Sequence, residues 1–255
     1  MAIESVLLNV TDIARSVEFY RRNLGAVVVE EGERAAELDL VTARLRLTRV
    51  DSPAESTWVG DDLQRGFRHV GFKVSDLEAR VAALHDAGVT FHLEPIDAEG
   101  GVRITFFFDP DGTLLELVEG PLQYHEVYDR DAVERDWALG DPDRPRFDHV
   151  AGTVDDLEAT REHYAKLGYL HMSGIHQPSD DRGFEIDFLR SGDSSLEIFT
   201  YGTAEKSKRV PQLDAPGFVA VAFGADSAPG APVGTVSGHD VFADPDGLPY
   251  VIAPA

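Results

Sequence analysis

Cysteine is absent from this chain of 255 residues, and basic residues are scarce. Without cysteine no disulfide can form, so a bound metal must take its ligands from histidine and carboxylate side chains. The 23 lysines and arginines stand against 46 acidic residues, and the resulting charge of −23 repels phosphate backbones and anionic membranes. No apolar run approaches the roughly 20 residues of a membrane helix, and the first residues lack the basic region of a signal peptide. We therefore expect a cytoplasmic protein that binds neither nucleic acid nor a membrane.

One local pattern occurs four times. In residues 6–25, 69–88 and 149–168 a short apolar strand leads to an Asp, then to apolar residues at helical spacing, and a Gly ends the segment. Residues 217–226 repeat the strand and the Asp, but the proline- and glycine-rich SAPGAPVG that follows excludes a helix. Alternating apolar residues and tight turns such as Asp-Pro-Asp-Gly predict about three more strands after each copy.

These copies divide the chain into four units, which the sequence predicts to form two domains. Units 1–58 and 67–120 make up an N-terminal domain, residues 1–120. Units 147–202 and 215–255, the last degenerate, make up a C-terminal domain, residues 147–255. The charged segment 121–146 between them reads as a linker with one helix. A length of 255 residues suits two domains of about 100–150 residues each.

The phrases TDIARSVEFYRRNLG and DPDGTLLELVE resemble the βαβββ unit of the vicinal oxygen chelate superfamily. That superfamily includes glyoxalases, bleomycin- and fosfomycin-resistance proteins, and extradiol dioxygenases. The resemblance implies an α+β fold in which four βαβββ units form two curled mixed-sheet domains.

The resemblance also implies where metal ligands fall. One lies on the first strand of a unit, seven residues before the Asp that opens the helix, and one is an acidic residue inside the closing strand. The first-strand positions, in chain order, hold Ser5, His69, His149 and Val219. The closing-strand positions hold Arg46, Glu116, Glu197 and Val251. Only the second and third units keep a His and a Glu, so we expect these two units to pair around one site for Zn²⁺, Ni²⁺, Co²⁺, Mn²⁺ or Fe²⁺.

Plainer interpretations exist for each of these residues. A lone His at the start of a strand is more often a surface residue, and a Glu can be a charge on an edge strand. Glu116 and Glu197, however, interrupt apolar strands, where an unpaired buried carboxylate costs several kcal/mol. We take both as candidate catalytic residues, together with His176 near the expected cavity rim. Phe199 and Tyr201 share strand parity with Glu197 and are expected to line its pocket, although ordinary packing would also explain them.

Three functions suit such a site. The two-His, two-Glu set resembles that of a glyoxalase-like lyase or isomerase, which moves a proton alpha to a carbonyl of a metal-chelated small molecule. The alternative is an Fe(II) extradiol dioxygenase that cleaves catechol-type rings, although Val219 and Val251 occupy the places where its usual C-terminal ligands would stand. The third is a metal-free protein that binds a small molecule, as resistance proteins do. A monomer or a homodimer could build the site.

Overall fold

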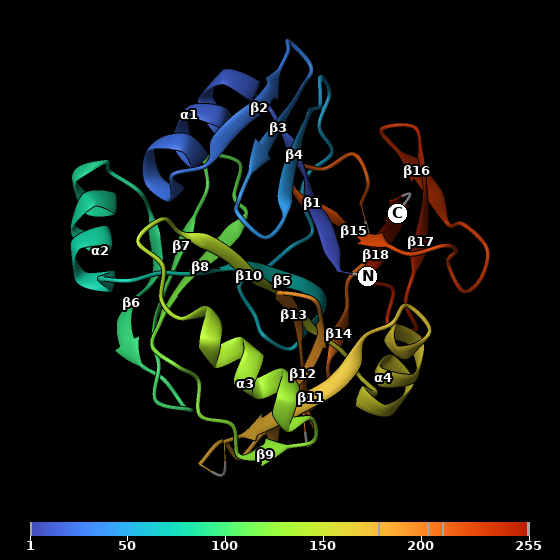
Figure 1. Ribbon diagram of the computed structural model, residues 1–255. Coiled ribbons are helices and arrows are strands. Elements are labelled where there is room, and N and C mark those ends of the chain that lie inside the picture. The colour runs from blue at the N-terminus through green and yellow to red at the C-terminus, as the bar shows by residue number, and fades with distance from the viewer. Residues whose placement is uncertain (1, 178, 203, 211, 254–255) are drawn as a thin grey trace.

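The structure is a computed structural model that describes residues 2–177, 179–202, 204–210 and 212–253. These residues form four helices and two mixed sheets (Figure 1). The helices are α1 (Ile13–Leu24), α2 (Leu77–Asp86), α3 (Arg130–Leu139) and α4 (Leu157–Ala165). The first two units and the linker contain β1 (Ile3–Val10), β2 (Val27–Glu31), β3 (Ala35–Asp39), β4 (Arg44–Arg49), β5 (Gln64–Lys73), β6 (Phe91–Asp97), β7 (Arg103–Phe108), β8 (Leu114–Glu119) and β9 (Glu126–Val127). The remaining strands are β10 (Arg146–Thr153), β11 (Leu170–His176), β12 (Phe184–Ser191), β13 (Ser194–Tyr201), β14 (Ser207–Lys208), β15 (Gly217–Gly224), β16 (Gly234–Val236), β17 (His239–Ala243) and β18 (Pro249–Ala253).

The helices α1, α2 and α4 begin where the repeated pattern predicts, and each ends within three residues of the predicted Gly. The Asp12 carboxylate accepts a hydrogen bond from the backbone N–H of Arg15 and so caps α1. Asp76 and Asp156 cap α2 and α4 in the same way. Gly25 ends α1 in the left-handed conformation, with φ of 62°, which glycine adopts without strain. The fourth unit has no helix, since none of residues 225–233, all described, is helical.

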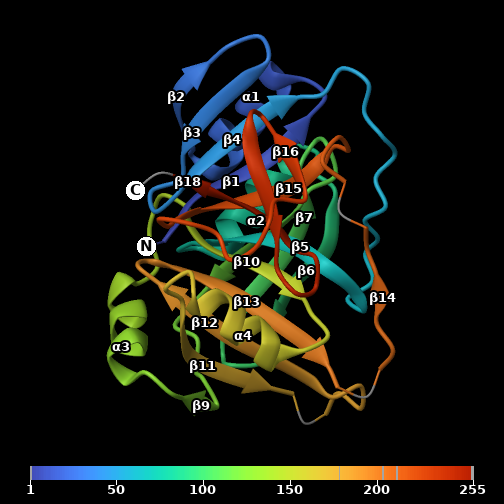
Figure 2. The same ribbon diagram turned by 90° about the vertical axis from the view of Figure 1, so that its right-hand side faces the viewer.

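Each sheet joins units from both halves of the chain. The outer sheet combines the first and fourth units in the order β16-β17-β18-β15-β1-β4-β3-β2. The inner sheet combines the second and third units in the order β6-β7-β8-β5-β10-β13-β12-β11-β9, with β14 paired to β5. Figure 2 shows outer-sheet strands above β10–β13 of the inner sheet. The predicted α+β fold class is confirmed, and the two units that keep His and Glu share one sheet.

Two tyrosines connect the units that are neighbours in sequence. The Tyr20 hydroxyl on α1 donates a 2.8 Å hydrogen bond to Asp109, in the Asp-Pro-Asp-Gly turn of the second unit. The Tyr164 hydroxyl on α4 donates a 3.4 Å hydrogen bond to Asp244, in the same turn of the fourth unit. These two hydrogen bonds connect the first unit to the second and the third unit to the fourth. They complement the sheets, which pair the first unit with the fourth and the second with the third.

The linker contains the expected helix. Ala132 and Val133 on α3 are buried in an apolar cluster with Met172 and Phe188 of the third unit. In the part of the chain that the structure describes, no helix is long and apolar enough to cross a membrane.

Candidate metal centre

The four predicted ligands lie on four adjacent strands of the inner sheet, β8, β5, β10 and β13. Strand register places them in two rows that run across the sheet, each with a Glu at one end, a small residue in the middle and a His at the other end. The rows are Glu116, Gly71 and His149, and Glu197, Ala151 and His69. Because β5 and β10 are antiparallel, the two rows run in opposite directions and their four functional side chains converge on one face.

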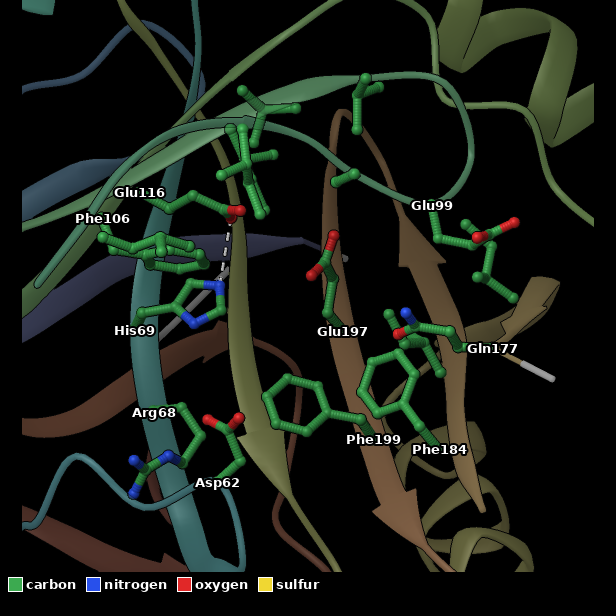
Figure 3. A pocket seen from close by; sticks show the side chains of 18 of the residues that line it. Asp62, Arg68, His69, Glu99, Phe106, Glu116, Gln177, Phe184, Glu197 and Phe199 are labelled. Carbon is green, nitrogen blue, oxygen red and sulfur yellow. Dashed lines mark ion pairs between the residues drawn. The ribbon is translucent and has the colours of Figure 1, made fainter. Parts of the chain in front are cut away.

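The side chains meet closely enough to share one cation. One ligand atom from each residue lies within 4.8 Å of every other. Glu116 Oε2 is 3.2 Å from His69 Nε2 and 2.9 Å from His149 Nε2. Glu197 Oε2 is 3.4 Å from His149 Nε2, and the two imidazole Nε2 atoms are 3.2 Å apart. Figure 3 shows His69, Glu116 and Glu197 pointing toward one another. Two imidazoles and two carboxylates suit a divalent transition metal, so the donor set fits the predicted group.

Gly71 is required for this convergence. A Cβ atom at this position would lie 2.1 Å from Cε1 and 2.2 Å from Nε2 of His149. The imidazole of His149 therefore lies directly against the backbone of β5, in space that only glycine leaves open. Sequence reasoning missed Gly71, whose role depends on which residue of β10 lies opposite it.

A β-bulge adds a second partner for His149. Between Phe147 and His149 the register of β10 against β5 shifts, so Asp148 is the extra residue. Its carboxylate lies 3.1 Å from His149 Nδ1. An ionised carboxylate can only accept, so this contact keeps a proton on Nδ1 and leaves Nε2 facing the centre. Asp148 was not predicted either, because its position directly before His149 carries meaning only once the bulge is known.

Burial and neighbouring charges separate the pKa values of the two glutamates. Burial raises the pKa of Glu197 to about 8, with the nearby carboxylates of Glu116 and Asp148 adding to the effect of burial. Burial would also raise the pKa of Glu116, but the adjacent imidazoles outweigh it and lower that pKa to about 2. Burial lowers the pKa of His69. For His149 the surrounding carboxylates, Glu197 foremost, outweigh burial and raise the pKa well above its ordinary value.

The centre borders a cavity of about 450 Å³. His69, Glu116 and Glu197 line it, whereas His149 lies behind them and is only 1% exposed. Phe199 and Tyr201, expected from strand parity to line the pocket of Glu197, are among its lining residues. Phe106 and Phe184 add further aromatic surface, so most of the wall beside the centre is apolar (Figure 3).

The structure does not bring His176 to this cavity. Its neighbours Ile175 and Gln177 line the cavity, and alternate residues of a strand point to opposite faces. His176 is exposed, and its ring contacts that of His125 at a centroid distance of 4.6 Å. The sequence-based proposal of His176 as an acid–base residue is therefore wrong, because the strand turns this side chain away.

The corresponding positions of the outer sheet hold no similar cluster. Val219 and Val251 are buried in an apolar cluster, Ser5 is fully buried, and Arg46 pairs with Glu37 at 3.1 Å. Among the described residues, the inner-sheet cluster is the one group of three or more potential ligands.

Comparison with known proteins agrees with this fold. A family model described as "Glyoxalase/Bleomycin resistance protein/Dioxygenase superfamily" matches residues 2–117. A lactoylglutathione lyase of Pseudomonas aeruginosa is 35% identical over 144 residues, covering 46% of this chain and 81% of that protein. The metallothiol transferase FosB of Staphylococcus epidermidis is 31% identical over 133 residues, covering 51% of this chain and 91% of that protein. Glyoxalase I of Zea mays superimposes with a TM-score of 0.66 at 20% identity, covering 99% of this chain and 92% of that chain.

The chain belongs to the glyoxalase/bleomycin resistance protein/dioxygenase superfamily, as the resemblance in its sequence predicted. The curated relatives match about half of the chain, whereas the likeness to the maize protein extends over nearly all of it and shows a common fold.

Proposed function

We propose that this protein is a metal-dependent lyase or isomerase that moves a proton alpha to a carbonyl of a small molecule. The observation that carries the proposal is the convergence of two imidazole nitrogens and two carboxylate oxygens beside a cavity that three of the four side chains line. The relatives named lactoylglutathione lyase support the same class of activity.

The four side chains have distinct roles in this proposal. His69, His149, Glu116 and Glu197 would hold a divalent cation, which supplies a Lewis acid for polarising a carbonyl oxygen. Glu197 is the stronger candidate for moving the proton, because it lines the cavity and its side chain is more exposed than that of Glu116, 15% against 6%. Glu116, whose Oε2 lies within 3.2 Å of both imidazole Nε2 atoms, is suited to remain an anionic ligand, and is the second candidate for proton transfer.

Elemental analysis of anaerobically purified protein tests the metal. We expect about one Zn²⁺, Ni²⁺, Co²⁺ or Mn²⁺ per chain. His69→Ala and Glu197→Ala should each lower the metal content. Ser5→Ala and Val219→Ala are matched controls, since they alter the first-strand ligand positions of the first and fourth units, and they should retain the metal. Loss of metal from the controls, with retention in the first pair, would contradict the assigned site.

Assays of the metal-loaded protein then test the reaction, with hemithioacetals and 2-oxo thioesters as substrates. About one Fe²⁺ per chain, forming a nitrosyl complex whose spectrum changes with catechol, would instead support the extradiol dioxygenase. A protein that holds no metal under these conditions would be a small-molecule binding protein.

A further inference from the structure

Arg68 is a buried cation that forms no close ion pair with the part of the chain that the structure describes. Among the described residues three arginines are buried, Arg68, Arg146 and Arg190. Arg146 has Asp148 within 3.9 Å, and Arg190 is paired with Asp136. Among the described residues, no carboxylate oxygen lies within 4.0 Å of the Arg68 guanidinium. In a chain with 46 acidic residues, an unpaired buried arginine is unusual.

The contacts of Arg68 hold the guanidinium in place but leave part of it free. It lies over the ring of Trp58, with Cζ 4.8 Å from the ring centroid. Nη2 donates to the Val59 carbonyl at 2.8 Å, and Nη1 makes a long 3.4 Å contact with Gln64 Oε1. Nε is buried and has no hydrogen-bond partner in the described structure. Asp62 and Asp61 act on the Arg68 guanidinium only through longer-range charge interactions, and Asp62, drawn beside it in Figure 3, also interacts with the Tyr201 hydroxyl.

A second β-bulge places Arg68 beside the metal centre. The register of β5 against β10 shifts between Phe67 and His69, so Arg68 is the extra residue. This bulge corresponds to the one at Asp148, since each precedes the His of its unit. The extra residues of the two bulges carry opposite charges and make different contacts. Asp148 contacts the imidazole of His149, whereas Arg68 borders the cavity that His69 also lines.

We propose that Arg68 binds an anionic group, a carboxylate or a phosphate, at the end of the substrate away from the metal-chelating oxygens. This inference rests on the proposed function and names its substrate class. A buried guanidinium without a close ion pair gains a charge-assisted hydrogen bond from such a group, and its planar fork suits both anions. The rings of Phe106 and Phe199 flank His69, with centroids 5.0 and 6.4 Å from its ring, so the part of the substrate between the two ends lies against aromatic surface.

Binding of hydroxamates to the metal-loaded protein tests the anchor. Acetohydroxamate presents only the two chelating oxygens, whereas the monohydroxamates of succinic, glutaric and adipic acid add a carboxylate at increasing distance. For one chain length we expect the acid to bind about tenfold or more tighter than its methyl ester. Arg68→Gln should remove that advantage, while affinity for acetohydroxamate changes less than about twofold. A hydroxamate of the same length that carries a phosphonate in place of the carboxylate tells the two anions apart. The anion that Arg68 prefers should lose more affinity in Arg68→Gln.

A control variant and a metal-free arm complete the test. Arg103→Gln removes a partly exposed arginine that does not line the cavity, and it should leave the carboxylate advantage intact. If Arg68→Gln unfolds the protein, Arg68→Lys, which keeps the charge, should retain part of the advantage.

In metal-free protein, 3-phenylpropanoate should bind weakly and require Arg68. If this arm succeeds while no metal or hydroxamate binds, the proposed function fails and the anchor stands. An equal affinity for acid and ester at every length, or an advantage that persists in Arg68→Gln, overturns the anchor.

Discussion

Gly71 shows how far the centre depends on a single absent side chain. In Gly71→Ala the new methyl group would overlap the imidazole of His149, so the ring must move away from the other three ligands. We expect metal affinity to fall by about tenfold or more, measured against a competing chelator, because a displaced ligand costs part of one coordination bond. Gly174→Ala, on β11 of the same sheet, is the control, since its Cβ would meet nothing closer than 3.4 Å. Equal metal affinity in both variants would show that the ring is not confined by β5.

Protonation of Glu197 predicts that metal binding depends on pH. Because burial raises its pKa to about 8, this side chain carries a proton at neutral pH in the metal-free protein, and metal must displace that proton. The raised pKa of His149 acts in the same direction. Metal affinity should therefore weaken as the pH falls below about 8, and adding metal at pH 7 in weak buffer should release protons. Glu116, with a pKa of about 2, adds no such dependence above pH 4.

Glu197→Gln is the control for this dependence, because an amide holds no titratable proton. The variant should bind metal more weakly and with a shallower pH dependence, and it should release fewer protons. Proton release identical to that of the unaltered protein would assign the protons to other groups.

At the scale of elements, the tyrosines of α1 and α4 test how helices are fixed to neighbouring units. Tyr20→Phe deletes the donor to Asp109 and leaves a buried carboxylate oxygen with one hydrogen bond fewer. We expect the free energy of unfolding, measured in urea, to fall by about 1–2 kcal/mol. Tyr164→Phe provides the matched comparison and should cost less, because its bond to Asp244 is 3.4 Å long. A larger loss for Tyr164→Phe would rule out hydrogen-bond length as the deciding factor.

The sequence predicted those elements and ligands that depend on local order. A capping Asp begins α1, α2 and α4, and a Gly follows the end of each within three residues; the count from that Asp that the family resemblance implies locates His69 and His149. The bulges could not be predicted, because a register shift is a property of two strands that are 80 residues apart in sequence. Gly71 and Arg68 were missed for this reason: Gly71 matters because of the residue opposite it on β10, and Arg68 because it is itself the extra residue of a bulge. His176 was misassigned because strand parity near its loop was unknown.

At the scale of the whole molecule, the centre links the two halves of the chain. Two ligands come from the second unit and two from the third, and the strands that carry them form the middle of the inner sheet. A metal bound there should stabilise the entire fold, because it binds the folded chain and the site does not exist once β5 and β10 separate. At a free metal concentration 100 times the dissociation constant, the expected gain in free energy of unfolding is about 2.7 kcal/mol.

Thermal unfolding with and without a chelator measures this stabilisation. Removing the metal should lower the midpoint, and restoring it should raise the midpoint in proportion to the logarithm of metal concentration. His69→Ala, which should lack the metal, is expected to unfold at a midpoint that the chelator does not change. Because one chain supplies all four ligands, the effect should be independent of protein concentration. A stabilisation that grows with protein concentration would mean that two chains build the centre together. A midpoint that does not change with metal would mean that the folded chain binds the metal no better than the unfolded chain does, which contradicts the assigned centre.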